Sequence, residues 1–134
     1  MFLIDTNIWL ERLLNQERSE EVGQLFNQFS SENFYITDFS FHSIGIILCK
    51  LNKRETFGKF TKDIFIEGSV NMIHLEPEDV DTIIYTMKHF ALDFDDAYQY
   101  CVTRKYNLLL VSFDKDFDRT DIKRIEPKNI LNKI

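Results

Sequence analysis

The residues with the clearest chemical potential are aspartates that follow short apolar runs. Asp5 comes directly after the run at 2–4, and Asp114 comes shortly after the run at 108–111. Parallel strands end at one edge of a sheet, and sites in open α/β sheets lie just beyond that edge. We therefore expect both carboxylates at the same edge, although they come from opposite ends of the sequence.

A third acidic group stands at the start of the helix predicted before the last apolar run. It consists of Asp93, Asp95 and Asp96. The N-terminus of a helix holds anionic side chains favourably. Because Asp96 precedes Ala97, which belongs to the apolar face of this helix, we expect Asp96 at the edge of the buried face.

Three carboxylates at one point repel each other unless a cation joins them. Oxygen ligands suit Mg²⁺ or Mn²⁺, and the sequence has no cysteine and histidine spacing that suggests zinc. A divalent cation held by Asp5, Asp96 and Asp114 would activate water and neutralise charge at a phosphate. The sequence therefore indicates metal-dependent chemistry on a phosphodiester.

Each aspartate also has a structural explanation. Asp5 and Asp114 can cap helices, and Asp96 can stabilise a helix dipole. Their joint occurrence at positions that the fold makes convergent favours the metal site. Phosphotransferases of the haloacid-dehalogenase type also begin with an aspartate after a first strand, but that chemistry needs a second aspartate two residues later, where this sequence has Asn7.

Alternating strand and helix patterns must position these residues. They predict an α/β fold, a three-layer α/β/α sandwich with a short, mainly parallel central sheet, in a single domain over 1–134. The predicted strands are 2–4, 34–36, 70–74, 108–111 and an edge strand at 123–125. The predicted helices are 8–14, 20–29, 38–51, 54–66, 77–90, 94–106 and 127–131.

Composition and charge narrow the function classes. The 134 residues are 44% hydrophobic, which is enough for a core, and no stretch is long and apolar enough for a membrane helix. We expect a cytoplasmic protein without membrane contact.

The net charge is −6, but acids concentrate in 63–103 and bases flank that region. The flanking bases either contact phosphates or form solvated helix faces: Lys50, Lys53, Arg54, Lys59 and Lys62, then Lys115, Arg119, Lys123 and Arg124. Aromatic residues either stack on bases or pack in the core: Phe41, Tyr98 and Tyr100.

Three segments carry a resemblance to a known family. They are FLIDTNIWLERL, LDFDDAYQYCVTRKYNLLLVSFDKDF and IKRIEPKNIL, in this order. The sequence is similar to PIN-domain proteins of the VapC-like toxin kind. The resemblance implies a metal-dependent endoribonuclease that is the toxin of a type II toxin–antitoxin pair. It also implies Mg²⁺ (or Mn²⁺) as cofactor, RNA as substrate, a homodimer and a small antitoxin protein as partner.

The resemblance further implies roles for individual residues. Asp5, Asp96 and Asp114 correspond to metal ligands. Thr6 or Asn7, together with Ser112, would orient Asp5 by hydrogen bonds. Asp116 would hold a second metal ion or a water molecule, or would simply begin a short helix.

One position departs from the family pattern. The family places a glutamate on the helix after the second strand, where this sequence has Ser43. Asp38, in the first turn of that helix, is the candidate to compensate as a fourth catalytic carboxylate, and His42 is the other nearby option. The alternative is a catalytically weak or inactive PIN-like scaffold that binds RNA or a protein partner.

Overall fold

The computed structural model describes residues 1–132, and its strands form one short sheet. These strands are β1 (Phe2–Ile4), β2 (Phe34–Thr37), β3 (Asn71–Ile73) and β4 (Leu109–Val111). Their order is β3-β2-β1-β4, and every neighbouring pair is parallel. β1 thus lies in the middle, with Ile4 paired to Val111 of β4. This register places the ends of β1 and β4 side by side.

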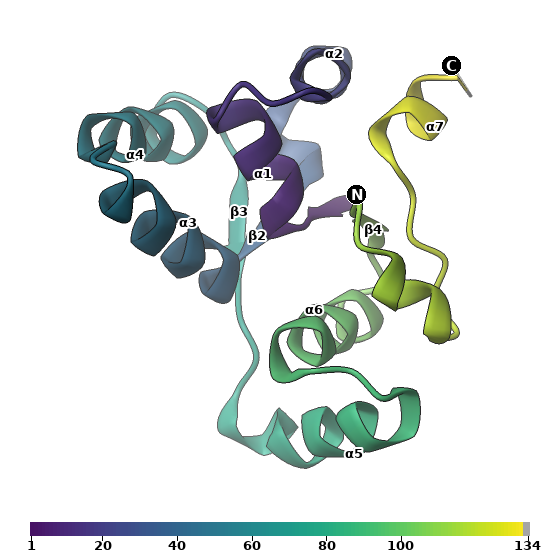
Figure 1. Cartoon of the computed structure of the whole chain (residues 1–134). Coiled ribbons are helices and arrows are strands. Elements are labelled where there is room, and N and C mark those ends of the chain that lie inside the picture. The colour runs from purple at the N-terminus through teal and green to yellow at the C-terminus, as the bar shows by residue number, and fades with distance from the viewer. Residues whose placement is uncertain (133–134) are drawn as a thin grey trace.

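Helices cover both faces of the sheet and give three layers (Figure 1). The helices are α1 (Thr6–Leu13), α2 (Ser19–Gln28), α3 (Asp38–Lys50), α4 (Arg54–Thr61), α5 (Val80–Phe90), α6 (Phe94–Lys105) and α7 (Pro127–Leu131). The predicted α/β/α architecture is confirmed. α5 and α6 pack on one face, and α1 to α4 with α7 lie on the other.

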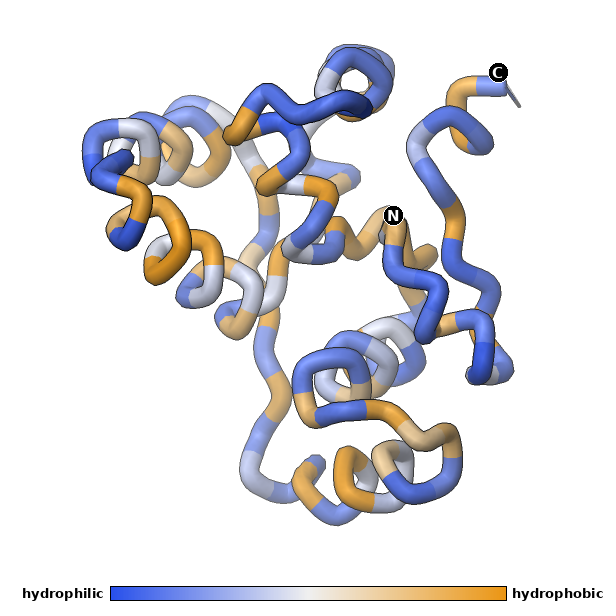
Figure 2. The backbone as a smooth tube through the Cα atoms, in the orientation of Figure 1, coloured by the Kyte–Doolittle hydropathy of each residue, from blue (hydrophilic) through white to orange (hydrophobic). Residues whose placement is uncertain are grey.

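The alternation of side chains along β1 explains the two cores. Phe2 and Ile4 belong to the core under α1 to α4, whereas Leu3 belongs to the core under α5 and α6. All three are buried, as expected for a strand covered on both faces. Figure 2 shows the hydrophobic β1 in the middle of the molecule, between the two helical layers.

Several predicted elements are shorter or more irregular than expected. The helix predicted at 54–66 is α4 followed by a π-helical turn at Lys62–Ile66, and the one predicted at 77–90 begins with a 3₁₀ turn at Pro77–Asp79. The predicted edge strand at 123–125 is only a single parallel bridge between Ile125 and Val111. No helix among residues 1–132 is long and apolar enough to cross a membrane.

Candidate metal centre

Three aspartates that are far apart in the sequence meet beyond the ends of β1 and β4. Asp5 is the N-cap of α1, and its backbone N–H donates to the carbonyl of Val111 at 3.0 Å. Asp114 caps the short 3₁₀ helix Lys115–Arg119, and Asp96 lies in the first turn of α6. All three line one pocket of about 270 Å³. The expected convergence of these residues is therefore present.

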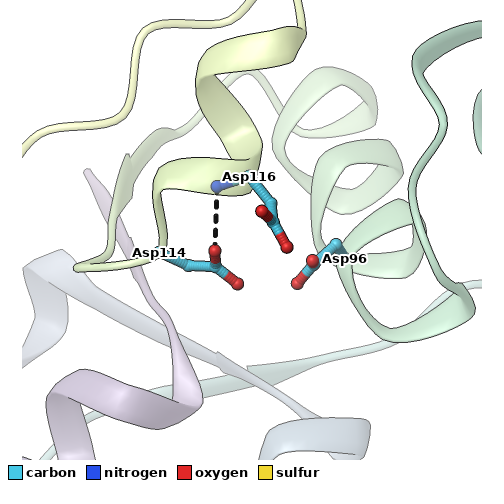
Figure 3. A group of neighbouring side chains, drawn as sticks. All are labelled: Asp96, Asp114 and Asp116. Carbon is cyan, nitrogen blue, oxygen red and sulfur yellow. Dashed lines mark hydrogen bonds between the residues drawn. The ribbon is translucent and has the colours of Figure 1, made fainter.

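The closest carboxylates come from α6 and the segment after β4. Single oxygens of Asp96, Asp114 and Asp116 all lie within 4.8 Å of one another. Figure 3 shows Asp96 extending from α6 toward the other two, with the backbone N–H of Asp116 donating to Asp114 Oδ1 at 2.9 Å. The exposed Asp116 is thus held beside Asp114 by its own backbone N–H.

The carboxylates of this group repel one another, and a bound cation would relieve that repulsion. Partial burial and the neighbouring carboxylates, Asp114 foremost, raise the pKa of Asp96 to about 7. Among residues 1–132, the only ion pair made by these aspartates joins Asp116 to Arg119 at 3.6 Å. Asp96 and Asp114 have no cationic partner among these residues, and clustered carboxylate oxygens are the donor set of a hard divalent ion. The residues present therefore fit Mg²⁺ or Mn²⁺.

Asp5 is buried and held by three donors. Its Oδ1 accepts from the Thr6 backbone N–H at 2.9 Å and from Gln99 Nε2 at 3.0 Å. Its Oδ2 accepts from Ser112 Oγ at 2.7 Å. Burial raises the pKa of Asp5, and these hydrogen bonds oppose the rise because they favour the ionised carboxylate.

The supporting residues predicted around Asp5 form one connected network. Ser112 Oγ donates to Asp5 and accepts from the Asp114 backbone N–H at 3.0 Å and from Asn7 Nδ2 at 3.3 Å. Asn7 Oδ1 in turn accepts from the backbone N–H of Phe113 at 3.3 Å. Ser112 thus links Asp5 to the loop that carries Asp114, whereas Asn7 reaches Asp5 only through Ser112.

Neither candidate for the missing fourth carboxylate joins the group. Asp38 Oδ1 accepts from the hydroxyl of Tyr98 and from the Phe39 backbone N–H, both at 2.8 Å. Asp38 is absent from the residues that line the pocket, whereas Ser43 is among them. His42 instead lies beside an apolar hollow that includes Phe41 and Phe57. The position of the usual glutamate faces the pocket, but it carries only a hydroxyl.

Sequence reasoning missed Gln99 at this site, and it gave no site role to two residues at the start of α6. Gln99 is 2% exposed and touches Asp5, Asp95 lines the pocket, and Phe94 is 46% exposed directly before it. Gln99 lies three residues after Asp96, which places both on one side of a helix. That spacing was the available signal for Gln99. The exposure of Phe94 has no signal in the sequence.

The structure places several of the basic and aromatic residues that either contact RNA or serve the fold. Arg124 is engaged by Asp118 and Glu126, and Lys59 by Asp63. Tyr98 and Tyr100 are buried, and Phe41 packs against Phe57 and Phe65. The exposed aromatic residue next to the acidic residues of α6 is instead Phe94, whose ring lies 6.5 Å from that of the pocket residue Phe39.

Solved structures with 15–18% sequence identity share this fold, among them a toxin and a toxin–antitoxin complex. VapC20 of Mycobacterium tuberculosis, described as a sarcin-ricin loop cleaving toxin, has a TM-score of 0.77 at 15% identity over 93% of this chain and 98% of its own. FitAcB from Neisseria gonorrhoeae has a TM-score of 0.72 at 18% identity, over 96% and 99%. A toxin–antitoxin complex from Klebsiella pneumoniae has 0.73 at 17%, over 95% and 98%.

The sequence itself carries the family signal. None of the curated proteins is a significant sequence match. The family model of the PIN domain, however, matches residues 2–123, which include Asp5, Asp96 and Asp114. This match covers nearly all of the sequence and agrees with the parallel sheet and with its structural neighbours. The chain belongs to the PIN domain family.

Proposed function

We propose that this PIN domain is a metal-dependent endoribonuclease, the toxin of a type II toxin–antitoxin pair. The observation that carries the proposal is the meeting of Asp5, Asp96 and Asp114 in one pocket, with an oxygen of Asp116 within 4.8 Å of oxygens of Asp96 and Asp114. The structural similarity to toxins and toxin–antitoxin complexes supports the same conclusion. Residues 1–134 would form a single PIN-like domain, and its expected cytoplasmic location stays a prediction.

The side chains have separable tasks in this reaction. Asp5, Asp96 and Asp114 would hold Mg²⁺ or Mn²⁺. Ser112, which Asn7 supports, would hold Asp5 and Asp114 in place. A divalent cation held there polarises a phosphate and lowers the pKa of a bound water. If this bound water is the nucleophile, it attacks the phosphorus, the bond to the 3′ oxygen breaks, and the 2′-hydroxyl of the RNA takes no part. We therefore expect products with a 5′-phosphate and a 3′-hydroxyl.

The test is a cleavage assay on protein stripped of metal. Mg²⁺ or Mn²⁺ is added back to the wild type and to Asp5→Asn, with single-stranded and structured RNA as substrates. We expect cleavage only in the wild type with metal, and product ends that a 3′-phosphatase leaves unchanged. Absence of cleavage with every metal would refute the proposal, and a 2′,3′-cyclic phosphate would refute this mechanism.

A specific observation keeps a second function open. Ser43 occupies the position of the usual glutamate, and Asp38 is held by Tyr98 outside the pocket. The domain would then be a catalytically weak or inactive scaffold that binds RNA or a protein partner. Calorimetry with Mn²⁺ separates the two functions. A scaffold whose site has lost its metal releases no binding heat, whereas a nuclease binds Mn²⁺ and loses affinity in Asp96→Asn.

The proposed toxin function also predicts protein partners. A small antitoxin protein and a second copy of the chain are the expected partners. An apolar hollow beside α3, lined by Phe41, Ile46 and Phe57, is one candidate contact surface. Size-exclusion chromatography with light scattering tests the homodimer, and copurification with the product of a neighbouring gene tests the antitoxin.

A further inference from the structure

Gln99 is a buried side chain whose amide connects Asp5 of the candidate metal centre to the N-terminus of α3. It lies on α6, one turn after Asp96, and is only 2% exposed. Its Nε2 donates to Asp5 Oδ1 at 3.0 Å and to Ser40 Oγ at 2.9 Å, and its Oε1 accepts from Thr37 Oγ1 at 2.9 Å. A buried polar group is costly unless it is paired, and this amide pairs with three side chains.

The orientation of the Gln99 amide is set by Asp5 and is compatible with the cap of α3. The backbone N–H of Ser40 can only donate, and it donates to Thr37 Oγ1 at 3.0 Å. The hydroxyl of Thr37 can still donate or accept a second hydrogen bond, whereas an ionised Asp5 carboxylate can only accept, so the end of Gln99 that meets Thr37 is Oε1. The NH₂ group of Gln99 consequently faces Asp5. Asp5 thus determines which end of Gln99 it meets, and the cap of α3 supplies the donor that Oε1 needs.

The contact with Gln99 decides which oxygen of Asp5 keeps a free acceptor position for a cation. A carboxylate oxygen has about two acceptor positions. Oδ1 uses both, for the Thr6 N–H and for Gln99, whereas Oδ2 uses one, for Ser112. The remaining acceptor position is on Oδ2. A neutral amide also orients Asp5 without the positive charge of lysine or arginine, which would oppose a divalent cation.

We propose that Gln99 is a positioning residue of the metal centre, which turns Asp5 so that Oδ2 is left to face the cation. The inference rests on the proposed metal-dependent function. It assigns a task to a side chain of α6 in a site where the usual glutamate is missing. In this arrangement the chain Thr37–Gln99–Asp5 connects the cap of α3 to the pocket.

The test is a double-mutant cycle read by Mn²⁺ binding. Metal-free wild type, Gln99→Met, Asp5→Asn and the double variant are titrated with Mn²⁺ by calorimetry. Loss of a residue that orients a metal ligand typically weakens metal affinity by about 10–100-fold, and we expect this for Gln99→Met. In the Asp5→Asn background the same change should have little further effect, because Gln99 acts through Asp5.

A matched control separates positioning from general damage to α6. Thr103 is buried one turn further along this helix and donates to the backbone carbonyl of Gln99 at 2.8 Å. Thr103→Val should lower stability but leave Mn²⁺ affinity unchanged. Should Gln99→Met fail to fold, Gln99→Asn keeps the amide one methylene short of Asp5 and should weaken Mn²⁺ binding similarly.

The outcomes distinguish this inference from the proposed function. A wild type that binds Mn²⁺ with a Gln99 variant that binds equally well overturns the positioning role alone. An equal loss of affinity with and without the Asp5 carboxylate overturns it as well. A wild type that does not bind Mn²⁺ at all overturns the metal-dependent function first, and the positioning role with it.

Discussion

Removing the Asp96 carboxylate should stabilise the metal-free protein. The pKa of Asp96 rises from an ordinary value of 3.8 to about 7 because the side chain is partly buried beside other carboxylates. A rise of this size corresponds to about 4 kcal/mol when the group is ionised. Because the side chain remains partly open to water, screening reduces the effect, and we expect about 2 kcal/mol.

The sign of this effect depends on pH. Between about pH 4 and pH 7 the unfolded chain loses the Asp96 proton while the folded protein retains it. The free energy of unfolding of the wild type therefore falls across this range and levels off above it. Asp96→Asn lacks this contribution, so it should be about 2 kcal/mol more stable than the wild type at pH 8 and similar to it at pH 4.

Thermal unfolding in the presence of a chelator measures this difference. For a protein of this size, 2 kcal/mol raises the midpoint by about 6 °C. Asp81→Asn is the matched control, because Asp81 also lies in the first turn of a helix but is exposed on α5. That variant should gain no stability. The reasoning is refuted if Asp96→Asn is no more stable than the wild type at pH 8, or if its gain persists at pH 4.

Three further results are expected. Mn²⁺ affinity should fall about tenfold for each pH unit below 7, because Asp96 must lose its proton to bind, and calorimetry at pH 6 and pH 8 measures this. Ser43→Glu should tighten Mn²⁺ binding about tenfold, because it adds a carboxylate to the pocket; Ser43→Gln, with an uncharged side chain of similar size, should not, and equal affinities would contradict the argument. Phe94→Leu should weaken binding of a single-stranded oligonucleotide by ~1–3 kcal/mol if a base stacks there, whereas Tyr85→Leu, at a 63% exposed ring on α5, should not. An unchanged fluorescence anisotropy titration for Phe94→Leu would exclude stacking at this ring.

The positions of Asp5 and Asp114 could be predicted because they depend on short-range patterns. Each lies just after a short apolar run that is typical of a strand covered on both faces, and parallel strands end at one edge. The three-layer fold followed from the same alternation. The details of the helices did not, since the π-helical turn at Lys62–Ile66 and the 3₁₀ turn at Pro77–Asp79 leave no mark on the apolar periodicity.

The contacts of polar side chains could not be predicted, because they depend on partners distant in the sequence. Asp38 lies near the edge of the sheet as expected, yet Tyr98, 60 residues later, takes its Oδ1. Gln99 and Thr37 are 62 residues apart and each is unremarkable within its own helix or strand. Only the packing of α6 against β2 and α3 turns them into neighbours.

In the proposed function, the bound cation would take part in binding RNA as well as in the reaction, because the pocket is acidic. The chain carries a net charge of −6, and its pocket gathers carboxylates that would repel a phosphate. Arg119 and Arg124, which follow Asp114 in the chain, are already bonded to acidic side chains. A bound cation would invert the local charge and so add attraction for RNA at this pocket, beside any contribution of exposed lysines such as Lys115. Substrate binding at the pocket and catalysis would then share one requirement, and both would depend on the same ionised aspartates.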